Sequence, residues 1–208
     1  STNRATVINC FAEGNVNATA ASANKASAGG LMGMNGGVVI NCVATGDVVS
    51  TLATQDVGGL CGRHTGIAAM YNSYYNAEAL QKNGNTVAEE NQACGVSVAG
   101  SKTENVLAKT KAQMATDAFA SELNTNNGNI ADTIQDLEKF LDTLSLVHHQ
   151  YYDNSALKAW YIDNGTLLLR DVMSGKEQEE QPGVQPGVPG GSGSGTTSGG
   201  QETNTPDD

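Results

Sequence analysis

The chain has 208 residues and a formal net charge of −11, and only 16% of its residues are charged, against about 25% in an average soluble domain. Its acidic balance and scattered Lys and Arg residues argue against binding to nucleic acid, and no apolar run reaches the ~18 residues of a membrane span. Its four cysteines include no Cys-x-x-Cys pair, so they indicate neither a disulfide scaffold nor a zinc site.

The first 77 residues contain an internal repeat. Val-Ile-Asn-Cys at 7–10 recurs at 39–42, and the related Met-Tyr-Asn-Ser occupies 70–73, so the copies are 32 and 31 residues apart. Two glycine boxes, Ala-Gly-Gly-Leu-Met-Gly and Val-Gly-Gly-Leu-Cys-Gly, fill 28–33 and 57–62. A unit of about 30 residues cannot bury its own apolar face, so neighbouring units must stack. The pattern predicts a parallel β-solenoid.

The alternation within each copy predicts which positions share a face of the strand. We expect one face to carry three rows of stacked side chains, which are Ile8/Ile40/Tyr71, Cys10/Cys42/Ser73 and Ala12/Ala44/Tyr75. The glycines suit corners that need a positive φ or a close backbone approach. The residues that define the repeat are Gly29, Gly30, Leu31, Gly33, Asn41, Cys42, Gly46, Gly58, Gly59, Leu60, Gly62 and Asn72.

The stretch 29–48, which begins Gly-Gly-Leu-Met-Gly and continues into Asn-Cys-Val-Ala-Thr-Gly, resembles the GLUG repeat of bacterial surface proteins. The resemblance covers 7–77 and weakens in the second box, where Arg63-His64-Thr65-Gly66 replaces the family's Asn-x-Gly turn. It implies a right-handed parallel β-helix on a secreted or wall-attached, adhesin-like protein, and it implies no catalytic residue. The first copy keeps only its second half, so we expect the chain to begin inside a repeat.

Residues 78–105 are expected to form a loop and one last strand, near Gly95–Gly100, which joins the array to the next region. Thr110 and Gln113 make a capping box that predicts a helix over 111–123, ended by Asn124–Gly128. The apolar stripe Ile130, Ile134, Leu137, Leu141 and Leu144 predicts a second helix. This helix is too short for a partner-binding coil, so we expect it to pack on the side or the end of the solenoid.

Asp163-Asn164-Gly165 between two apolar runs predicts a β-hairpin within 157–172. With the helices it would form an α+β cap over 106–173 that shields the last open strand, an order similar to the end of many GLUG arrays. All four prolines lie beyond 174, and 174–208 is expected to be a disordered Pro/Gly/Ser-rich linker. We expect this linker to tether the module to further domains or to an envelope anchor.

The sequence offers little catalytic chemistry. It has no His-Glu-x-x-His motif, and neither His64 nor the adjacent His148 and His149 predicts a metal site. Cys10 and Cys42 would lie on adjacent rungs within disulfide range, but two buried thiols are the favoured interpretation. Cys61 in the glycine box and Cys94 in a loop lack the partners of a nucleophile.

Acids are equally sparse in the repeats: Glu13, Asp47 and Asp56 lie near turns, and Arg63 stands alone. The repeats therefore predict neither a catalytic groove nor a cofactor.

We therefore predict a non-catalytic module of the bacterial cell surface that acts as a spacer or adhesion scaffold for an extracellular protein or glycan. Tyr71, Tyr74 and Tyr75 are the aromatic cluster of the array, and an exposed Tyr74 would suit a sugar face. The favoured alternative is that the cluster packs under the cap. An accessory domain of a large secreted peptidase or carbohydrate-active enzyme, and a β-helix enzyme with an unrecognised groove, remain open.

Overall fold

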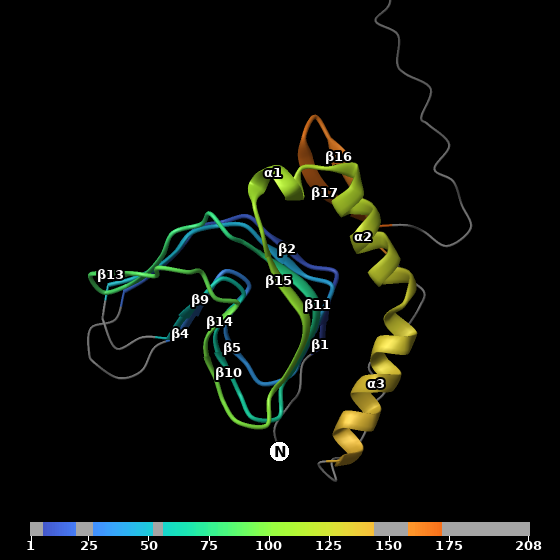
Figure 1. Ribbon diagram of the computed structural model, residues 1–208, viewed down its shortest axis with the longest axis horizontal. Coiled ribbons are helices and arrows are strands. Elements are labelled where there is room, and N and C mark those ends of the chain that lie inside the picture. The colour runs from blue at the N-terminus through green and yellow to red at the C-terminus, as the bar shows by residue number, and fades with distance from the viewer. Residues whose placement is uncertain (1–5, 20–26, 52–55, 144–157, 172–208) are drawn as a thin grey trace, which may run out of the picture. The chain divides into compact units, whose positions relative to one another are not determined.

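The computed structural model describes residues 6–19, 27–51, 56–143 and 158–171, all of which fall within one compact unit of the chain. The expected linker at 174–208, together with His148 and His149, lies outside the described residues. The fold is mainly β. Parallel strands form a sheet that curls into a half-barrel, accompanied by a few short helices (Figure 1).

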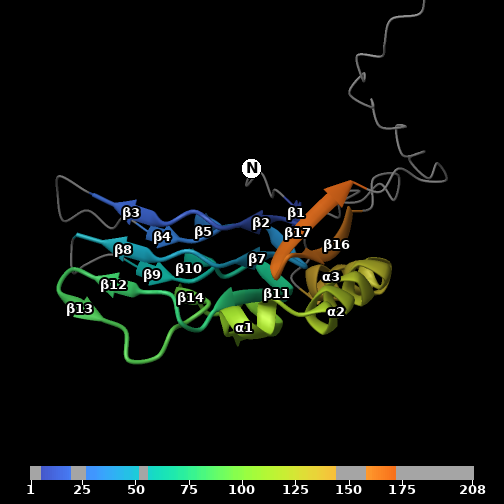
Figure 2. The ribbon, with the colours of Figure 1, turned by 90° about the horizontal axis from the view of Figure 1, so that it is seen from above.

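The chain passes round the sheet repeatedly, and the strands of each pass lie beside those of the pass before (Figure 2). The first pass contains β1 (Thr6–Ile8), β2 (Phe11–Ala12), β3 (Val16–Ala18), β4 (Ser27–Gly29) and β5 (Met32–Asn35). The second contains β6 (Val38–Ile40), β7 (Val43–Ala44), β8 (Val48–Ser50), β9 (Asp56–Gly58) and β10 (Cys61–His64). The third contains β11 (Ala69–Asn76), β12 (Gln81–Asn83), β13 (Thr86–Val87) and β14 (Cys94–Ser97), and β15 (Lys102–Lys109) begins a fourth.

The strand register follows the sequence repeat. Ile8 on β1 pairs with Ile40 on β6, and Ile40 pairs with Tyr71 on β11, in parallel strands. This confirms the parallel, in-register stacking of the repeat copies. The expected strand near Gly95–Gly100 is β14. The strand β15 was not foreseen, because its residues are polar and exposed, but it pairs in parallel with β11 and crosses the expected array–cap boundary at 105/106.

The asparagine of each copy adopts a left-handed backbone conformation. The φ angles are 50° at Asn9, 53° at Asn41, 46° at Asn72 and 52° at Asn105, and asparagine is one of the few residues that tolerate this region. Because a left-handed residue interrupts the extended chain, the alternation of side chains reverses there. Asn105 shows that β15 carries a fourth copy of this feature.

Because of this reversal, the prediction that all three rows of stacked side chains lie on one face of the strand is wrong. The Cys and Ala rows point into the concave side, where Cys42 and Ala44 pack with Tyr75, Val39 and Met70. The row of Ile8, Ile40 and Tyr71 points to the opposite, convex side, together with Val38 and Ala69.

The glycine boxes allow two layers of backbone to approach each other closely. A Cβ on Gly29 would overlap Cys61 Cα, and one on Gly58 would lie 2.7 Å from Cys94 Cα. Similar overlaps with backbone atoms would occur at Gly30, Gly33 and Gly62, while at Gly59 the Cβ would press on the Tyr75 side chain. The boxes are therefore explained by close approach, since none of these six glycines has a positive φ.

Helices α1 (Lys111–Met114), α2 (Asp117–Gly128) and α3 (Ile130–Thr143) follow β15. The capping box at Thr110 and the helix from Ile130 are confirmed. The single helix expected over 111–123 is wrong, because Thr116 starts a new helix by accepting a hydrogen bond from the Phe119 backbone N–H at 3.2 Å. The prediction that the helix ends at Asn124 is also wrong, because α2 continues to Gly128.

The asparagines at the end of α2 stay helical because each is held by distant parts of the chain. Asn124 bonds to both backbone groups of Trp160 at 2.8 Å, Asn126 Nδ2 donates to the Tyr74 hydroxyl at 3.0 Å, and Asn127 Oδ1 accepts from Asn9 at 2.7 Å. These bonds outweigh the weak helix propensity of asparagine. Helix propensity depends on the local sequence alone, so it gives no indication of these long-range hydrogen bonds.

The predicted hairpin is confirmed as β16 (Lys158–Asp163) and β17 (Thr166–Asp171), whose turn has positive φ at Asn164 and Gly165. The hairpin and the helices were expected to form a cap over the last strand, but most residues of that strand, β15, are exposed. The hairpin and the helices lie against the convex side of the sheet (Figure 1), where Phe119, Leu123 and Trp160 pack on Val43 and Tyr74. Ile130 and Leu137 of α3 cover the isoleucine row.

Candidate functional site

The tyrosine cluster is buried rather than displayed. Tyr71, Tyr74 and Tyr75 expose 2%, 0% and 9% of their surface. Tyr74 lies under α2, with its ring edge-on to Phe119 and its hydroxyl donating to Glu122 Oε1 at 2.8 Å. Burial and the Glu122 carboxylate raise the pKa of Tyr74 to about 12. The idea of an exposed sugar-binding Tyr74 is therefore wrong, and Tyr74 packs beneath the helices while Tyr75 fills the concave side.

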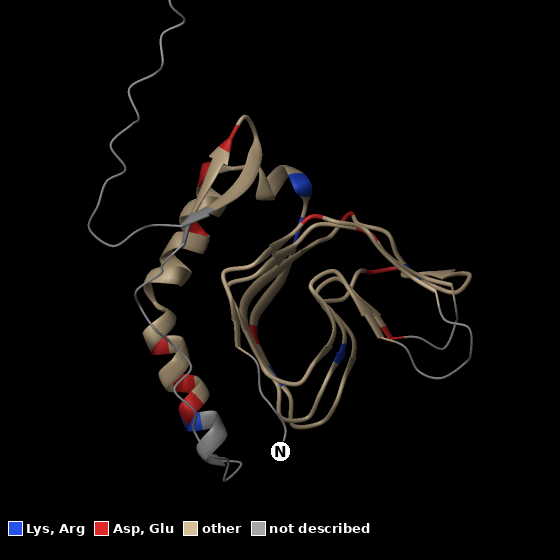
Figure 3. Ribbon diagram, turned by 180° about the vertical axis from the view of Figure 1, so that it is seen from behind, with Lys and Arg blue, Asp and Glu red and all other residues tan. Residues whose placement is uncertain are grey.

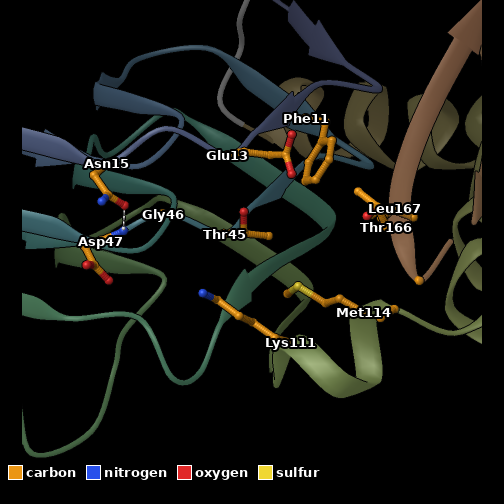
Figure 4. A pocket seen from close by; sticks show the side chains of 12 residues that line it. Phe11, Glu13, Asn15, Thr45, Gly46, Asp47, Lys111, Met114, Thr166 and Leu167 are labelled. Atoms are coloured by element: carbon orange, nitrogen blue, oxygen red, sulfur yellow. Dashed lines mark hydrogen bonds between the residues drawn. The ribbon is translucent and has the colours of Figure 1, made fainter. Parts of the chain in front are cut away.

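A pocket of about 380 Å³ lies where two turns of the sheet meet α1 and the hairpin (Figure 4). The turn after β2 and the turn after β7 are equivalent segments of successive repeats, and they form one wall. Helix α1 and the hairpin turn form the other. The lining residues are Phe11, Glu13, Asn15, Thr45, Gly46, Asp47, Lys111, Met114, Ala115, Gly165, Thr166 and Leu167.

The two turns are fixed by a ladder of side-chain to backbone hydrogen bonds. The Asp47 backbone N–H donates to Asn15 Oδ1 at 2.9 Å, and Asp47 Oδ1 in turn accepts from the Leu80 N–H at 2.8 Å. A Cβ on Gly46 would overlap the carbonyl oxygen of Gly14, so the turns stack too closely for any other residue. The wall is therefore rigid, and its spacing follows from the repeat.

The pocket combines apolar surface with groups that bind hydroxyls. Phe11, Met114 and Leu167 contribute apolar side chains, whereas Glu13 and Asp47 contribute carboxylates and Lys111 an ammonium group. Figure 4 shows Glu13, Thr45 and Lys111 pointing into the space between the turns and the helix. Such a lining can hold a small polar ligand by an apolar face and several hydrogen bonds.

Sequence reasoning placed Glu13 and Asp47 near turns but did not join them into a site. The 32-residue separation of Asn15 and Asp47, one repeat length, was the available signal. The other wall, with Lys111 and Leu167, comes together only through tertiary packing. Arg63, which the sequence left alone, forms an ion pair of 2.7 Å with Asp56 on the adjoining strand.

A second group of reactive side chains lies inside the curl. The ligand atoms of Cys61, His64 and Cys94 are all within 4.8 Å of one another, although no metal site was predicted from these residues. Cys61 and Cys94 are register partners on β10 and β14, and the Cys61 thiol donates to Cys94 Sγ at 2.9 Å. Cys94 therefore lies on a strand rather than in a loop.

His64 is fully buried. Its Nε2 lies 3.1 Å from the Lys102 carbonyl oxygen, and its Nδ1 lies 3.2 Å from Asn35 Nδ2. Nε2–H therefore donates and Nδ1 accepts. Burial lowers the pKa of His64, and the bond to Lys102 offsets this effect in part.

The favoured interpretation of Cys10 and Cys42 as buried thiols holds for Cys42, whereas Cys10 is only half-buried. None of the four cysteines, all of which lie in described segments, is in a disulfide. The Cys42 thiol donates to the Ile40 carbonyl at 3.2 Å, and burial raises the pKa of Cys42 well above its usual range. Cys42 is a buried thiol that packs as a small core residue.

Comparison with protein-family models, curated proteins and solved structures finds no match to this chain. Among the helices that the structure describes, none has the length and apolar character needed to cross a membrane.

Proposed function

We propose that this chain is a non-catalytic module of the bacterial cell surface, built as the end of a right-handed parallel β-helix of GLUG-like repeats. It acts as a stiff scaffold that presents turn residues to an extracellular glycan. The observation that carries the proposal is the pocket, because one of its walls consists of the same turn from two successive repeats. In a longer array the same wall would recur at each repeat.

The stacked register supports a scaffold role. Strands one repeat apart pair in parallel from β1 to β15, and the left-handed asparagines recur at each copy. Neighbouring strands in a sheet are about 4.8 Å apart, so equivalent turn residues are held at a fixed spacing. A rigid display loses little conformational entropy when it binds a ligand.

The lining of the pocket favours a glycan over a protein as ligand. Carboxylate, amide and hydroxyl groups accept and donate hydrogen bonds to sugar hydroxyls, while the Phe11 ring and Leu167 offer apolar surface to the C–H face of a sugar ring. Most of the described acidic residues lie on the helices and the turns (Figure 3), and the pocket holds two carboxylates, of Glu13 and Asp47, against the one ammonium group of Lys111. A neutral glycan is therefore expected to bind better than an anionic one.

A glycan array tests the proposal directly. We expect the full chain to bind neutral glycans, and Glu13→Gln to weaken that binding about tenfold or more, because a hydrogen bond to a charged group contributes about 1.5–3 kcal/mol. Glu89→Gln is the matched control, since it removes the same charge from an exposed residue that is absent from this pocket.

Equal loss of binding in the Glu13→Gln and Glu89→Gln variants would assign the binding to overall charge rather than to the pocket. If the wild-type protein bound no glycan at all, the adhesive role would be refuted and only the spacer role would remain.

A further inference from the structure

The two sulfur atoms on β10 and β14 are closer than two thiols normally lie. Cys61 Sγ and Cys94 Sγ are 2.9 Å apart, and their residues are register partners on adjacent parallel strands. Such partners have Cα atoms about 4.8 Å apart, which falls within the range of 4.4–6.8 Å typical of disulfides. The backbone therefore already has the spacing of a disulfide.

A metal ion fits this group less well than a covalent bond. Two thiolates on a tetrahedral zinc ion, with Zn–S bonds of about 2.3 Å, are separated by about 3.8 Å. The sulfur atoms would have to move apart, and His64 would have to give up a hydrogen bond to Asn35 or Lys102 in order to become a ligand. A disulfide needs only that the sulfurs close to about 2.05 Å.

The surroundings of Cys10 and Cys42 provide a comparison within the same chain. The Cys42 thiol is directed to backbone carbonyl groups, donating to Ile40 at 3.2 Å and to Val7 at 3.6 Å. The Cys61 thiol is instead directed to the sulfur of Cys94. The two pairs are separated by 32 and 33 residues, and the Cys42 thiol has a contact of 3.2 Å with a backbone carbonyl, whereas the Cys61 thiol has one of 2.9 Å with a sulfur.

We propose that Cys61 and Cys94 are a redox pair that forms a disulfide across β10 and β14 when the chain meets a disulfide oxidant such as oxidised glutathione. The proposal does not depend on the function proposed above.

The Cys94 thiolate attacks one sulfur of the oxidant, whose S–S bond breaks and whose other half leaves as a thiolate. The Cys61 sulfur then attacks Cys94 Sγ of this mixed disulfide and displaces the second half. Two S–H bonds and one S–S bond are lost, the Sγ–Sγ bond forms, and the two protons pass to the released thiols.

In the folded sheet, the hydrogen bond from Cys61 lowers the pKa of the Cys94 thiol. The same bond and burial raise the pKa of Cys61. Because Cys61 is fully buried in the folded sheet, exchange takes place in the unfolded or locally opened chain. The cross-link would then close a loop of 33 residues that contains β11, β12 and β13.

The test uses the full chain, purified in reductant and then refolded with oxidised glutathione. After denaturation and alkylation without reductant, we expect two of the four cysteines to stay unalkylated, and peptide mapping to find Cys61 joined to Cys94. This mapping requires no variant. Four alkylated cysteines, glutathione adducts alone, or a Cys10–Cys42 link in place of Cys61–Cys94 would each overturn the proposal.

Stability gives a second readout. We expect the oxidised protein to melt roughly 5–15 °C above the reduced protein, from the usual effect of a disulfide in a domain of this size. The difference should persist in the double variant Cys10→Ser/Cys42→Ser and vanish in Cys61→Ser/Cys94→Ser. If a chelator but not a reductant made the thiols available to alkylation, and elemental analysis found stoichiometric zinc, the disulfide would be overturned in favour of a metal site.

Discussion

Replacing Asn41 tests whether the asparagine ladder stabilises the fold through its side chains. Asn41 is fully buried, and its Nδ2 donates to Asn9 Oδ1 at 2.6 Å and to the Leu123 carbonyl at 3.0 Å. These bonds link the same position in two successive repeats and join the sheet to α2. The change Asn41→Gly removes both bonds while it keeps a residue that accepts the φ of 53°.

The expected loss can be worked out from these contacts. Asn9 Oδ1 left without a donor costs about 1–3 kcal/mol, and the lost bond to the Leu123 carbonyl, which keeps its partner within α2, costs about 1 kcal/mol more. About 1 kcal/mol is regained, because Asn41 Oδ1 is itself buried without a hydrogen-bond partner. We therefore expect Asn41→Gly to lower the free energy of unfolding by roughly 1–3 kcal/mol, apart from the cost of a more flexible unfolded chain.

Asn72→Gly is the matched control, because it changes the same residue type at the equivalent position and carries the same flexibility cost. Asn72 is only half-buried, and its Oδ1 accepts an exposed bond from Asn105 at 2.8 Å. Its loss should cost less than about 1 kcal/mol. Denaturant unfolding of both variants measures the difference, and equal losses within about 0.5 kcal/mol would refute the role of the Asn41 bonds.

Three further predictions concern packing, ionisation and docking. Gly58→Ala should cost about 3 kcal/mol or more or prevent folding, because the new Cβ overlaps the backbone of β10; Gly128→Ala, where the Cβ meets nothing within 4 Å, should be neutral or slightly stabilising in a thermal melt. The raised pKa of Tyr74 means that folding keeps its proton, so this contribution to stability should be complete below pH 10 and lost as the pH rises through about 12. A tyrosinate absorbance titration of wild type against Tyr74→Phe checks this, and Glu122→Gln should shift the Tyr74 titration to lower pH; an unchanged titration would contradict the proposed cause. Asn124→Ala should cost about 2 kcal/mol, because it removes both bonds to the Trp160 backbone, and a red shift of the Trp160 fluorescence should accompany the loosened hairpin; fluorescence and stability that match wild type would show that these bonds do not hold it.

The sequence by itself determined the features that depend on local spacing. The 32- and 31-residue offsets of the Val-Ile-Asn-Cys motif predicted the register of β1, β6 and β11. The capping box at Thr110 and the Asn164-Gly165 turn also formed as predicted, because their hydrogen bonds and φ angles involve neighbouring residues only. For the glycine boxes the sequence predicted either a positive φ or a close backbone approach, and the structure shows the close approach.

Tertiary structure decided the features in which distant residues meet. The alternation rule failed at Asn41 because a left-handed residue reverses the faces, which sent Ile40 outward and Cys42 inward. Helix α2 ran past Asn124 because Trp160, Tyr74 and Asn9 supply bonds that local propensity cannot contain.

The pocket and the thiol pair have the same origin. Glu13 and Lys111 line one pocket only after α1 packs beside the turns, and Cys61 contacts Cys94 only when β14 pairs with β10. The sequence fixes the period at which residues can stack. Whether two stacked side chains face each other depends on backbone angles and on packing partners that lie far away along the chain.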